Sequence, residues 1–317
     1  MFLKPKKLVL FGGTGHIGRA LLRNLDKDKY DFTVVTRCPS DPSHLAWDGK
    51  SLGAWKEALE DADVVINLAG RRVHCRYNEA NLREMMDSRL DSTRVIGEAI
   101  SRCKTPPKVW LQSSTATIYT HRFNAANDDD TGMLGGNEAG FPEAWKYSVE
   151  IAKRWEAVLD EADAPMTRKV AMRSAIMMGI DRDSAFDVFS KLARIGLGGR
   201  LGSGRQYVSW IHEADLCRAI EFLINHSELT GPVILASPNP LPQVEFARGL
   251  RDAWNVRLGL PATRWMVALG AWALNGDSEV VMKSRRVVPS KLLRAGFEFE
   301  YPNWPEAAAD LAARMRG

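Results

Sequence analysis

The chain has 317 residues, of which 45% are hydrophobic and 26% charged, so it can bury a sizeable core in one large or two small domains. Its 43 Lys and Arg stand against 39 Asp and Glu, and this small, evenly spread excess excludes a nucleic-acid or membrane binder driven by bulk charge. The four cysteines are far apart with no CxxC pair, which gives no sign of a disulfide framework or a zinc site. The first residues are basic and then briefly apolar, unlike a signal peptide. The longest later apolar run, 265–274, has about half the length that a membrane-spanning helix requires. We therefore expect a cytoplasmic protein with reduced thiols.

The first two-thirds of the chain alternates short β-branched segments with longer helical patterns, which is typical of a parallel sheet covered by helices on both faces. The expected strands cover 8–11, 32–36, 44–47, 64–68, 109–113 and 169–173. Apolar residues at helical spacing predict helices at 17–25, 51–59, 78–103 and 142–159, and the polar stretch 121–141 predicts a long loop at an edge of the sheet. The predicted fold class is α/β, with a doubly wound, Rossmann-like parallel sheet.

A change of composition after Gly179 indicates a second, smaller C-terminal α/β lobe. Glycines crowd the segment 196–204, prolines interrupt the chain at 238–242, and helices are expected at 243–254, 263–274, 290–294 and 305–315. We divide the chain into domains 1–174 and 175–317, and allow for the strand and helix around 207–236 to pack back on the first domain.

The sequence GGTGHIG follows the first expected strand directly and precedes an amphipathic helix. Gly12 permits a tight turn, Gly15 lets the backbone approach a pyrophosphate, and Gly18 lets helix and strand pack closely. The start of the helix adds free N–H groups and the positive end of its dipole. Because the glycines stand in the context that this motif requires, domain 1–174 is predicted to bind a dinucleotide; an ordinary strand-to-helix turn is the alternative. The expected contacts in the turn are Gly12, Thr14, Gly15, His16, Ile17 and Gly18.

The end of the second expected strand indicates which dinucleotide is bound. An acidic residue there would hold the ribose 2′-hydroxyl of NAD, but this chain has Arg37. An arginine can hold the 2′-phosphate of NADP through paired, charge-assisted hydrogen bonds, whereas a carboxylate would repel it. NADP is therefore the expected cofactor in preference to NAD, and the alternative is that Arg37 is a solvated loop cation.

Further motifs carry a resemblance to a known family. The glycine turn, NLAG at 67–70 and SSTATIY at 113–119 together resemble the extended short-chain dehydrogenase/reductases. More closely, the chain is similar to an atypical, epimerase-like subgroup, NAD-dependent epimerase/dehydratase-like with a C-terminal domain of unknown function. The motifs that match it are WD at 47–48, SRxxxT at 88–93, GSGRQxxSWIH at 202–212, and the C-terminal segments 258–261, 286–289 and 292–302.

The resemblance implies several cofactor contacts. Asp48 would accept a hydrogen bond from the adenine amino group, and Leu68, Ala69 and Gly70 would line the adenosine and ribose. Asp48 can instead, or in addition, cap a helix that starts near Ser51, and residues 68–70 can be only a strand end. Ser113 is also counted among the cofactor contacts, with a plain strand residue as its alternative.

The same resemblance exposes a missing catalytic pair. The family uses a helical Tyr, with Lys four residues later, as proton donor, but Tyr147 is followed at that spacing by Ile151. If Glu156 is matched to the acidic residue that usually ends this segment, the two positions fall on Ser148 and Ala152. In either alignment the Tyr-x-x-x-Lys pair is absent.

Other polar groups near the expected nicotinamide could contribute to catalysis. Besides the Tyr and Lys, the family uses a hydroxyl at the end of the fifth strand, and this position falls on Thr115. Tyr119 is the favoured substitute for the missing proton donor. The alternative is that Tyr119 is a buried aromatic with its hydroxyl satisfied. Arg173 either contacts the nicotinamide side or pairs with a carboxylate. His212 is either a binding group or a satisfied structural residue.

We therefore expect an NADP-dependent oxidoreductase or epimerase-like protein that acts on a small carbonyl or hydroxyl substrate. A sugar nucleotide is doubtful, because Val208 stands where epimerases carry a diphosphate-binding arginine and Arg205 comes three residues early. The alternative is a non-catalytic NADP(H)-binding sensor or regulatory protein. No metal site is indicated, and we expect no nucleic-acid or membrane partner; an oligomer is possible but not indicated.

Overall fold

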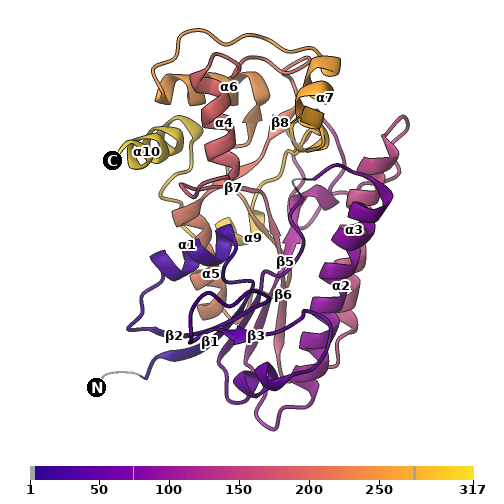
Figure 1. The fold of residues 1–317 in the computed structure, drawn as a ribbon, viewed down its shortest axis with the longest axis vertical. Coiled ribbons are helices and arrows are strands. Elements are labelled where there is room, and N and C mark those ends of the chain that lie inside the picture. Colours follow the sequence, from indigo (N-terminus) through magenta and orange to yellow (C-terminus); the bar gives the residue numbers. More distant parts are fainter. Residues whose placement is uncertain (1–3, 74, 274–275) are drawn as a thin grey trace.

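A seven-stranded, fully parallel sheet forms the centre of the structure (Figure 1). The computed structural model describes residues 4–73, 75–273 and 276–317. The strands, in chain order, are β1 (Lys6–Phe11), β2 (Tyr30–Thr36), β3 (Leu45–Ala46), β4 (Val64–Asn67), β5 (Val109–Thr115), β6 (Arg168–Ser174) and β10 (Gly231–Leu235). Their spatial order is β10-β6-β5-β4-β1-β2-β3, so the winding direction reverses between β1 and β4. This arrangement confirms the predicted fold class and puts the reversal, where ligands of such sheets bind, beside the glycine turn.

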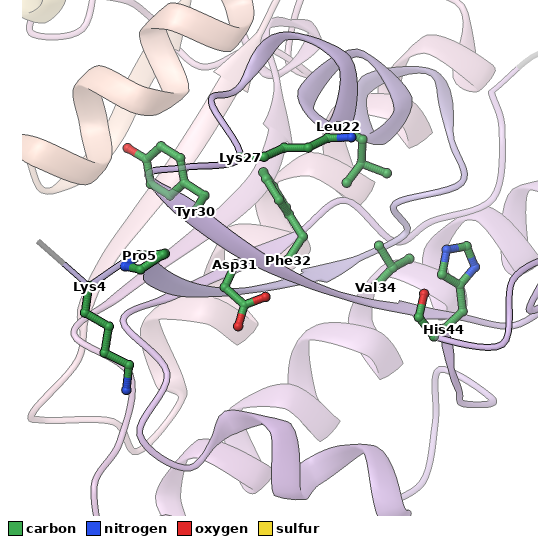
Figure 2. Close-up of a pocket in the computed structure, with 10 residues that line it drawn as sticks. Lys4, Pro5, Leu22, Lys27, Tyr30, Asp31, Phe32, Val34 and His44 are labelled. Atoms are coloured by element: carbon green, nitrogen blue, oxygen red, sulfur yellow. The ribbon is translucent and has the colours of Figure 1, made fainter. Parts of the chain in front are cut away.

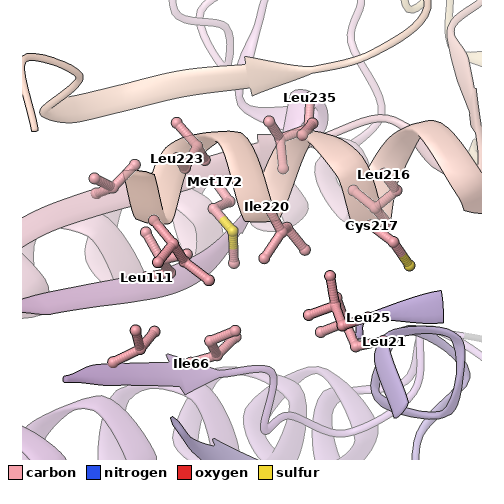
Figure 3. Packing of buried hydrophobic residues seen from close by; sticks show 14 of the residues in the cluster. Leu21, Leu25, Ile66, Leu111, Met172, Leu216, Cys217, Ile220, Leu223 and Leu235 are labelled. Atoms are coloured by element: carbon pink, nitrogen blue, oxygen red, sulfur yellow. The ribbon is translucent and has the colours of Figure 1, made fainter. Parts of the chain in front are cut away.

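Helices cover both faces of this sheet because successive β-strand side chains point to opposite sides. Leu8 and Leu10 of β1 pack toward α1 (His16–Asn24) and α5 (Glu213–Asn225), as Figure 3 shows for the neighbouring strands. Val9 and Phe11 belong to the core on the other face, with α2 (Glu79–Ser101) and the short 3-10 helix η1 (Ala54–Leu59). Helix α3 (Glu143–Glu161) packs beside α2.

The C-terminal region has a third core of its own. Its helices α4 (Ala185–Arg194), α6 (Gln243–Ala253) and α10 (Trp304–Arg316) meet around Trp304, whose ring stacks on Phe246 at 4.1 Å. The remaining elements are η2 (Ala116–Ile118), β7 (Ile176–Met178), β8 (Tyr207–Val208), β9 (Trp210–His212), β11 (Leu241–Pro242), α7 (Arg264–Ala273), α8 (Glu279–Met282) and α9 (Ser290–Arg294). The segment around 207–236 supplies α5 and β10, which lie on and in the main sheet.

Some predicted elements differ from those observed. The predicted helix 51–59 is reduced to η1, and the strand 44–47 to two residues. The loop 121–141 follows β5, an interior strand, but reaches the edge strand β10, where the Ile234 amide donates to Asp129 at 2.7 Å. Leu274, the last residue of the predicted helix 263–274, lies outside the described residues. Within the described ranges, no helix is both long and apolar enough to cross a membrane.

Gly18→Ala is expected to lower the free energy of unfolding by about 2 kcal/mol, the usual cost of overpacking. A Cβ at this position would lie 2.5 Å from the Cα and carbonyl oxygen of Gly13, and neither backbone atom can move cheaply. Gly270→Ala in α7 is the control: its Cβ would meet nothing within 4 Å, so urea denaturation should show no loss. Equal stability of the two variants would contradict the packing argument.

Candidate functional site

The glycine turn is built against the loop that follows β4. Gly12 has φ +76°, and a Cβ there would lie 3.0 Å from the backbone of Leu68. Gly15 stands at the N-terminus of α1 without a capping side chain, so the N–H groups of the first turn are left for a ligand. His16 lies in that turn, where its ring is held by Arg19 at 3.1 Å and Asp181 at 3.7 Å, and burial followed by the Arg19 charge lowers its pKa. The turn therefore presents backbone donors in a shape that only glycines permit.

The end of β2 carries the residues expected to select the cofactor. The Thr14 hydroxyl lies 3.2 Å from that of Thr36, which ties the glycine turn to this strand. Arg37 follows with its side chain exposed, and within the described residues no hydrogen bond or ion pair engages it. Its guanidinium is thus available to an anion at this end of the sheet.

Asp48 organises a turn after β3. Its carboxylate accepts hydrogen bonds from the backbone amides of Lys50 (2.8 Å) and Ser51 (2.9 Å), and from the Ser51 hydroxyl. These bonds, the Ser51 side chain foremost, lower its pKa to about 2. Because η1 begins only at Ala54, Asp48 holds the turn before that helix and does not cap it.

The loop 67–70 is clamped from two sides. Asn67 is fully buried, donates to Gln112 at 3.0 Å, and accepts from the Ala69 amide at 3.0 Å. From α2, Ser88 accepts from the amide of Arg71 at 2.9 Å, and Arg89 donates to the Arg71 carbonyl at 3.1 Å. Ser88 and Arg89 of the SRxxxT motif, which carried the resemblance without an assigned role, therefore hold Arg71, the residue directly after the loop where Leu68, Ala69 and Gly70 would line the adenosine.

A buried polar network connects the carboxyl ends of β5 and β6 with α3. Arg173 donates to both carboxylate oxygens of Glu156, at 2.8 and 2.6 Å, and to the Tyr119 hydroxyl at 2.9 Å. The Ser114 hydroxyl donates to Glu156 at 2.5 Å. Burial opposes the charge of Arg173, but the hydrogen bonds and charge of Glu156 outweigh it and raise the Arg173 pKa. Of the two alternatives for Arg173, the structure thus shows the carboxylate pair.

Tyr119 and Thr115 occupy different surroundings. Tyr119 is 2% exposed, and burial raises its pKa although Arg173 acts in the opposite direction. The structure thus shows the arrangement that the sequence left as the alternative for Tyr119, a buried aromatic whose hydroxyl has a partner. Thr115 is half-buried at the end of β5 and accepts from the Thr117 amide at 3.1 Å. Ser113 is also half-buried in β5, two residues earlier.

Helix α3 presents small side chains where the catalytic pair would stand. Ser148, Ala152 and Glu156 share the face toward β5, since Ala152 packs with the core around Tyr119 and Glu156 belongs to the network described above. Tyr147 packs instead beside α2, and Lys153 donates to the Gly135 carbonyl at 2.8 Å. The alignment on Glu156 is therefore the one that the geometry matches.

Three charged residues of the C-terminal region, which the sequence did not single out, contact α3 or η2. Glu279 accepts from the Ser148 hydroxyl at 2.6 Å, and Lys283 donates to the Thr117 carbonyl at 2.8 Å. Arg285 donates to the Thr117 hydroxyl at 3.1 Å. A carboxylate and a lysine four residues apart are typical of a solvated helix, so their burial gave no signal in the sequence.

Residues of the second lobe that the sequence singled out serve other purposes. His212 is fully buried at the start of α5: its Nδ1 accepts from the Ala214 amide, and its Nε2 lies 3.1 Å from Asp310. Burial lowers its pKa to about 4, so it stays neutral near pH 7. Arg205 is exposed and Val208 half-buried. His212 is thus a satisfied structural residue, the second of its two alternatives.

A hollow along the outer side of β2 lies apart from these groups. The connection from β2 to β3 contains no helix, and Tyr30, Phe32 and Val34 of β2 line the depression together with Leu22 of α1 and His44 (Figure 2). It follows the length of the strand from Lys4 onward, whereas the polar groups described above gather at carboxyl ends. We assign it no role in the site.

Glu156→Ala is expected to lower the free energy of unfolding by about 3 to 5 kcal/mol, because it leaves the buried Arg173 without its partner. Combining it with Arg173→Met should recover much of the loss. Glu150→Ala on the same helix removes an exposed pair with Arg154 and should cost less than about 1 kcal/mol in urea denaturation. A Glu156 variant as stable as the Glu150 variant would contradict the assignment of a buried, energetically coupled pair.

Comparisons with known proteins cover nearly the whole chain. Residues 8–235 match the NAD dependent epimerase/dehydratase family, and residues 263–311 match a domain of unknown function, DUF1731. An epimerase family protein of Staphylococcus epidermidis is 30% identical over 309 residues, covering 96% of this chain and 99% of that protein. These matches confirm the resemblance to the epimerase-like subgroup.

Solved structures agree with the fold. The crystal structure of human epimerase family protein SDR39U1 (isoform 2) with NADPH superposes with a TM-score of 0.83 at 26% identity, covering 97% of this chain and 99% of that one. A dTDP-4-dehydrorhamnose reductase from Bacillus anthracis, in complex with NADP, reaches a TM-score of 0.73 at 15% identity, covering 98% and 99% of the two chains. The second likeness concerns the fold alone.

Proposed function

Because the chain belongs to the NAD dependent epimerase/dehydratase family, we propose that it binds NADP(H) at the glycine turn and acts on a small carbonyl or hydroxyl substrate as an oxidoreductase or epimerase-like enzyme. The observation that carries the proposal is the pairing of the uncapped N-terminus of α1 with the unengaged Arg37 at the end of β2. A Cβ at Gly12 or Gly18 would collide with the backbone of Leu68 or Gly13, so the turn has the tight strand-to-helix packing that a dinucleotide-binding turn requires. The human relative solved with NADPH supports the choice of cofactor.

The roles of the individual residues follow from their places. The first turn of α1 would hold the pyrophosphate, Arg37 the 2′-phosphate, Asp48 the adenine amino group, and residues 68–70 with Ser113 the ribose and nicotinamide sides. When bound, the cofactor supplies or accepts a hydride. Thr115 would hydrogen-bond the substrate oxygen through its half-buried hydroxyl. Tyr119 stays a candidate proton donor, although its hydroxyl already accepts from Arg173.

The absence of a Tyr and Lys from the face of α3 toward β5 favours a second candidate function. Ser148 and Ala152 stand on the α3 face where the family carries its Tyr and Lys, and neither can donate a proton as a phenol does. This favours a non-catalytic sensor or regulatory protein that keeps the cofactor fold. The half-buried hydroxyl of Thr115 at the end of β5 favours the enzyme.

Arg37→Asp is expected to weaken NADPH binding about 100-fold, since it removes charge-assisted hydrogen bonds and adds repulsion at the 2′-phosphate. NADH affinity should be unchanged or increased, because NADH lacks that phosphate. The measurement is fluorescence titration of both nucleotides, with Arg257→Asp as the control for an exposed arginine elsewhere. Binding of neither nucleotide to the unaltered protein would overturn the proposal.

Thr115→Ala is expected to lower turnover about 100-fold while leaving NADPH affinity within about twofold, because it removes one donor at the substrate oxygen. Thr115→Ser keeps both the hydroxyl and the bond to the Thr117 amide, and should retain activity. NADPH oxidation is followed with phenanthrenequinone and aromatic aldehydes as carbonyl probes. Tight NADPH binding without turnover of any probe would favour the sensor instead.

A further inference from the structure

A carboxylate from another part of the chain contacts the residue at the place of the missing tyrosine. That residue is Ser148, whose hydroxyl donates to the Glu279 carboxylate at 2.6 Å. Glu279 is 1% exposed and Ser148 8%. The contact joins positions 131 residues apart, one on α3 and the other in the C-terminal region. In Figure 1, α7 of that region, in orange, lies beyond the ends of β5 and β6, whereas α9, in yellow, lies beside the sheet.

Lys283, one helical turn after Glu279, carries a buried ammonium to the turn that follows β5. Its side chain has no exposed surface, its Nζ donates to the Thr117 carbonyl at 2.8 Å, and the Glu279 carboxylate lies 3.7 Å away. The amide of the same Thr117 donates to the Thr115 hydroxyl. Thr117 is therefore hydrogen-bonded to Lys283 through its carbonyl and to Thr115 through its amide. An apolar side chain would fill this space at lower cost in desolvation, so packing alone does not explain a lysine here.

The charges around Lys283 come from several elements. On its own segment these are Glu279 and Arg285; from the loop after β5 they are His121, whose Nδ1 accepts from the Ser284 amide at 2.6 Å, and Glu138. Burial and Arg285 lower the Lys283 pKa, the two carboxylates raise it, and the result is about 8. A group with that pKa can both give and take a proton near neutral pH.

We propose that Lys283 is the proton-transfer group of this site, in place of the helical Tyr and Lys, and that Glu279 and Ser148 position it. The inference rests on the proposed function. In reduction, one N–H bond of the ammonium breaks, its proton bonds to the substrate oxygen, its electron pair stays on Nζ, and the neutral amine regains a proton from water. In oxidation the amine takes the proton from the substrate hydroxyl. The hydride that balances either direction belongs to the cofactor.

The test measures the dissociation constants of NADP⁺ and NADPH between pH 6.5 and 9.5. The quantity compared is the ratio of the NADP⁺ constant to the NADPH constant. The oxidised ring is positively charged and the reduced ring neutral, so a protonated Lys283 facing the ring disfavours only NADP⁺. Titration of the 2′-phosphate affects both forms and cancels. The ratio should fall about tenfold across this range, with a midpoint near pH 8.

Variants assign this fall to one side chain. In Lys283→Met the ratio should be low at every pH, and in Lys283→Arg, which keeps a permanent charge, it should be high at every pH. Glu279→Gln should move the midpoint down by about one pH unit, because it removes the carboxylate that favours the charged amine. Lys291→Met is the control, since Lys291 donates to the backbone carbonyls of Thr230 and Pro232 and should leave the fall unchanged.

The two proposals fail in different ways. A ratio that does not change with pH in the unaltered protein, or that still falls in Lys283→Arg, overturns the role of Lys283 while NADP(H) binding stands. If Lys283→Met does not fold, Lys283→Arg carries the same test because it keeps the charge and most of the stem. If the unaltered protein binds neither NADP⁺ nor NADPH, the proposed function and this inference are both overturned.

Discussion

All strands of the main sheet run in one direction, and this constraint decides where every polar group of the site can lie. The carboxyl ends of β1, β2, β4 and β5 meet at one edge, so segments far apart in sequence converge there. The reversal between β1 and β4 opens that edge beside the glycine turn, and Gly12 allows the turn to pack on the backbone of Leu68. The proposed cofactor binding at this edge would follow from strand direction and close backbone contact.

The face of α3 shows how the site departs from the arrangement typical of the family. Glu156 is buried in an ion pair with Arg173, so the C-terminal half of the helix is fixed to β5 and β6. One and two turns earlier the helix has the small residues Ala152 and Ser148; Glu279 of the C-terminal region contacts Ser148, and Lys283 reaches Thr117 after β5. The C-terminal region is therefore part of the wall of the site, which gives the domain of unknown function a physical connection to the proposed chemistry.

Sequence patterns predicted the local features well because local chemistry determines them. The glycine turn, the strands around it and the position of Arg37 directly after β2 need only neighbours in sequence, and periodicity is enough to assign an α/β sheet. Lys283 could not be predicted, since its partner carbonyl on Thr117 is 166 residues away and its spacing from Glu279 is also that of an exposed helix. Asp129 likewise belongs to an acidic run that suggests a solvated loop, yet it accepts from the Ile234 amide, 105 residues later. Such burial depends on the tertiary fold, which periodicity does not encode.

A crystal structure of the protein with NADPH would show whether the carboxyl ends of the strands and the C-terminal segment together enclose the cofactor. We expect the 2′-phosphate within hydrogen-bond distance of the Arg37 guanidinium, the pyrophosphate on the first turn of α1, and the nicotinamide ring between Thr115 and Lys283. A nicotinamide bound away from Lys283 would contradict the role given to the C-terminal segment. A nucleotide bound away from the glycine turn would contradict the account as a whole.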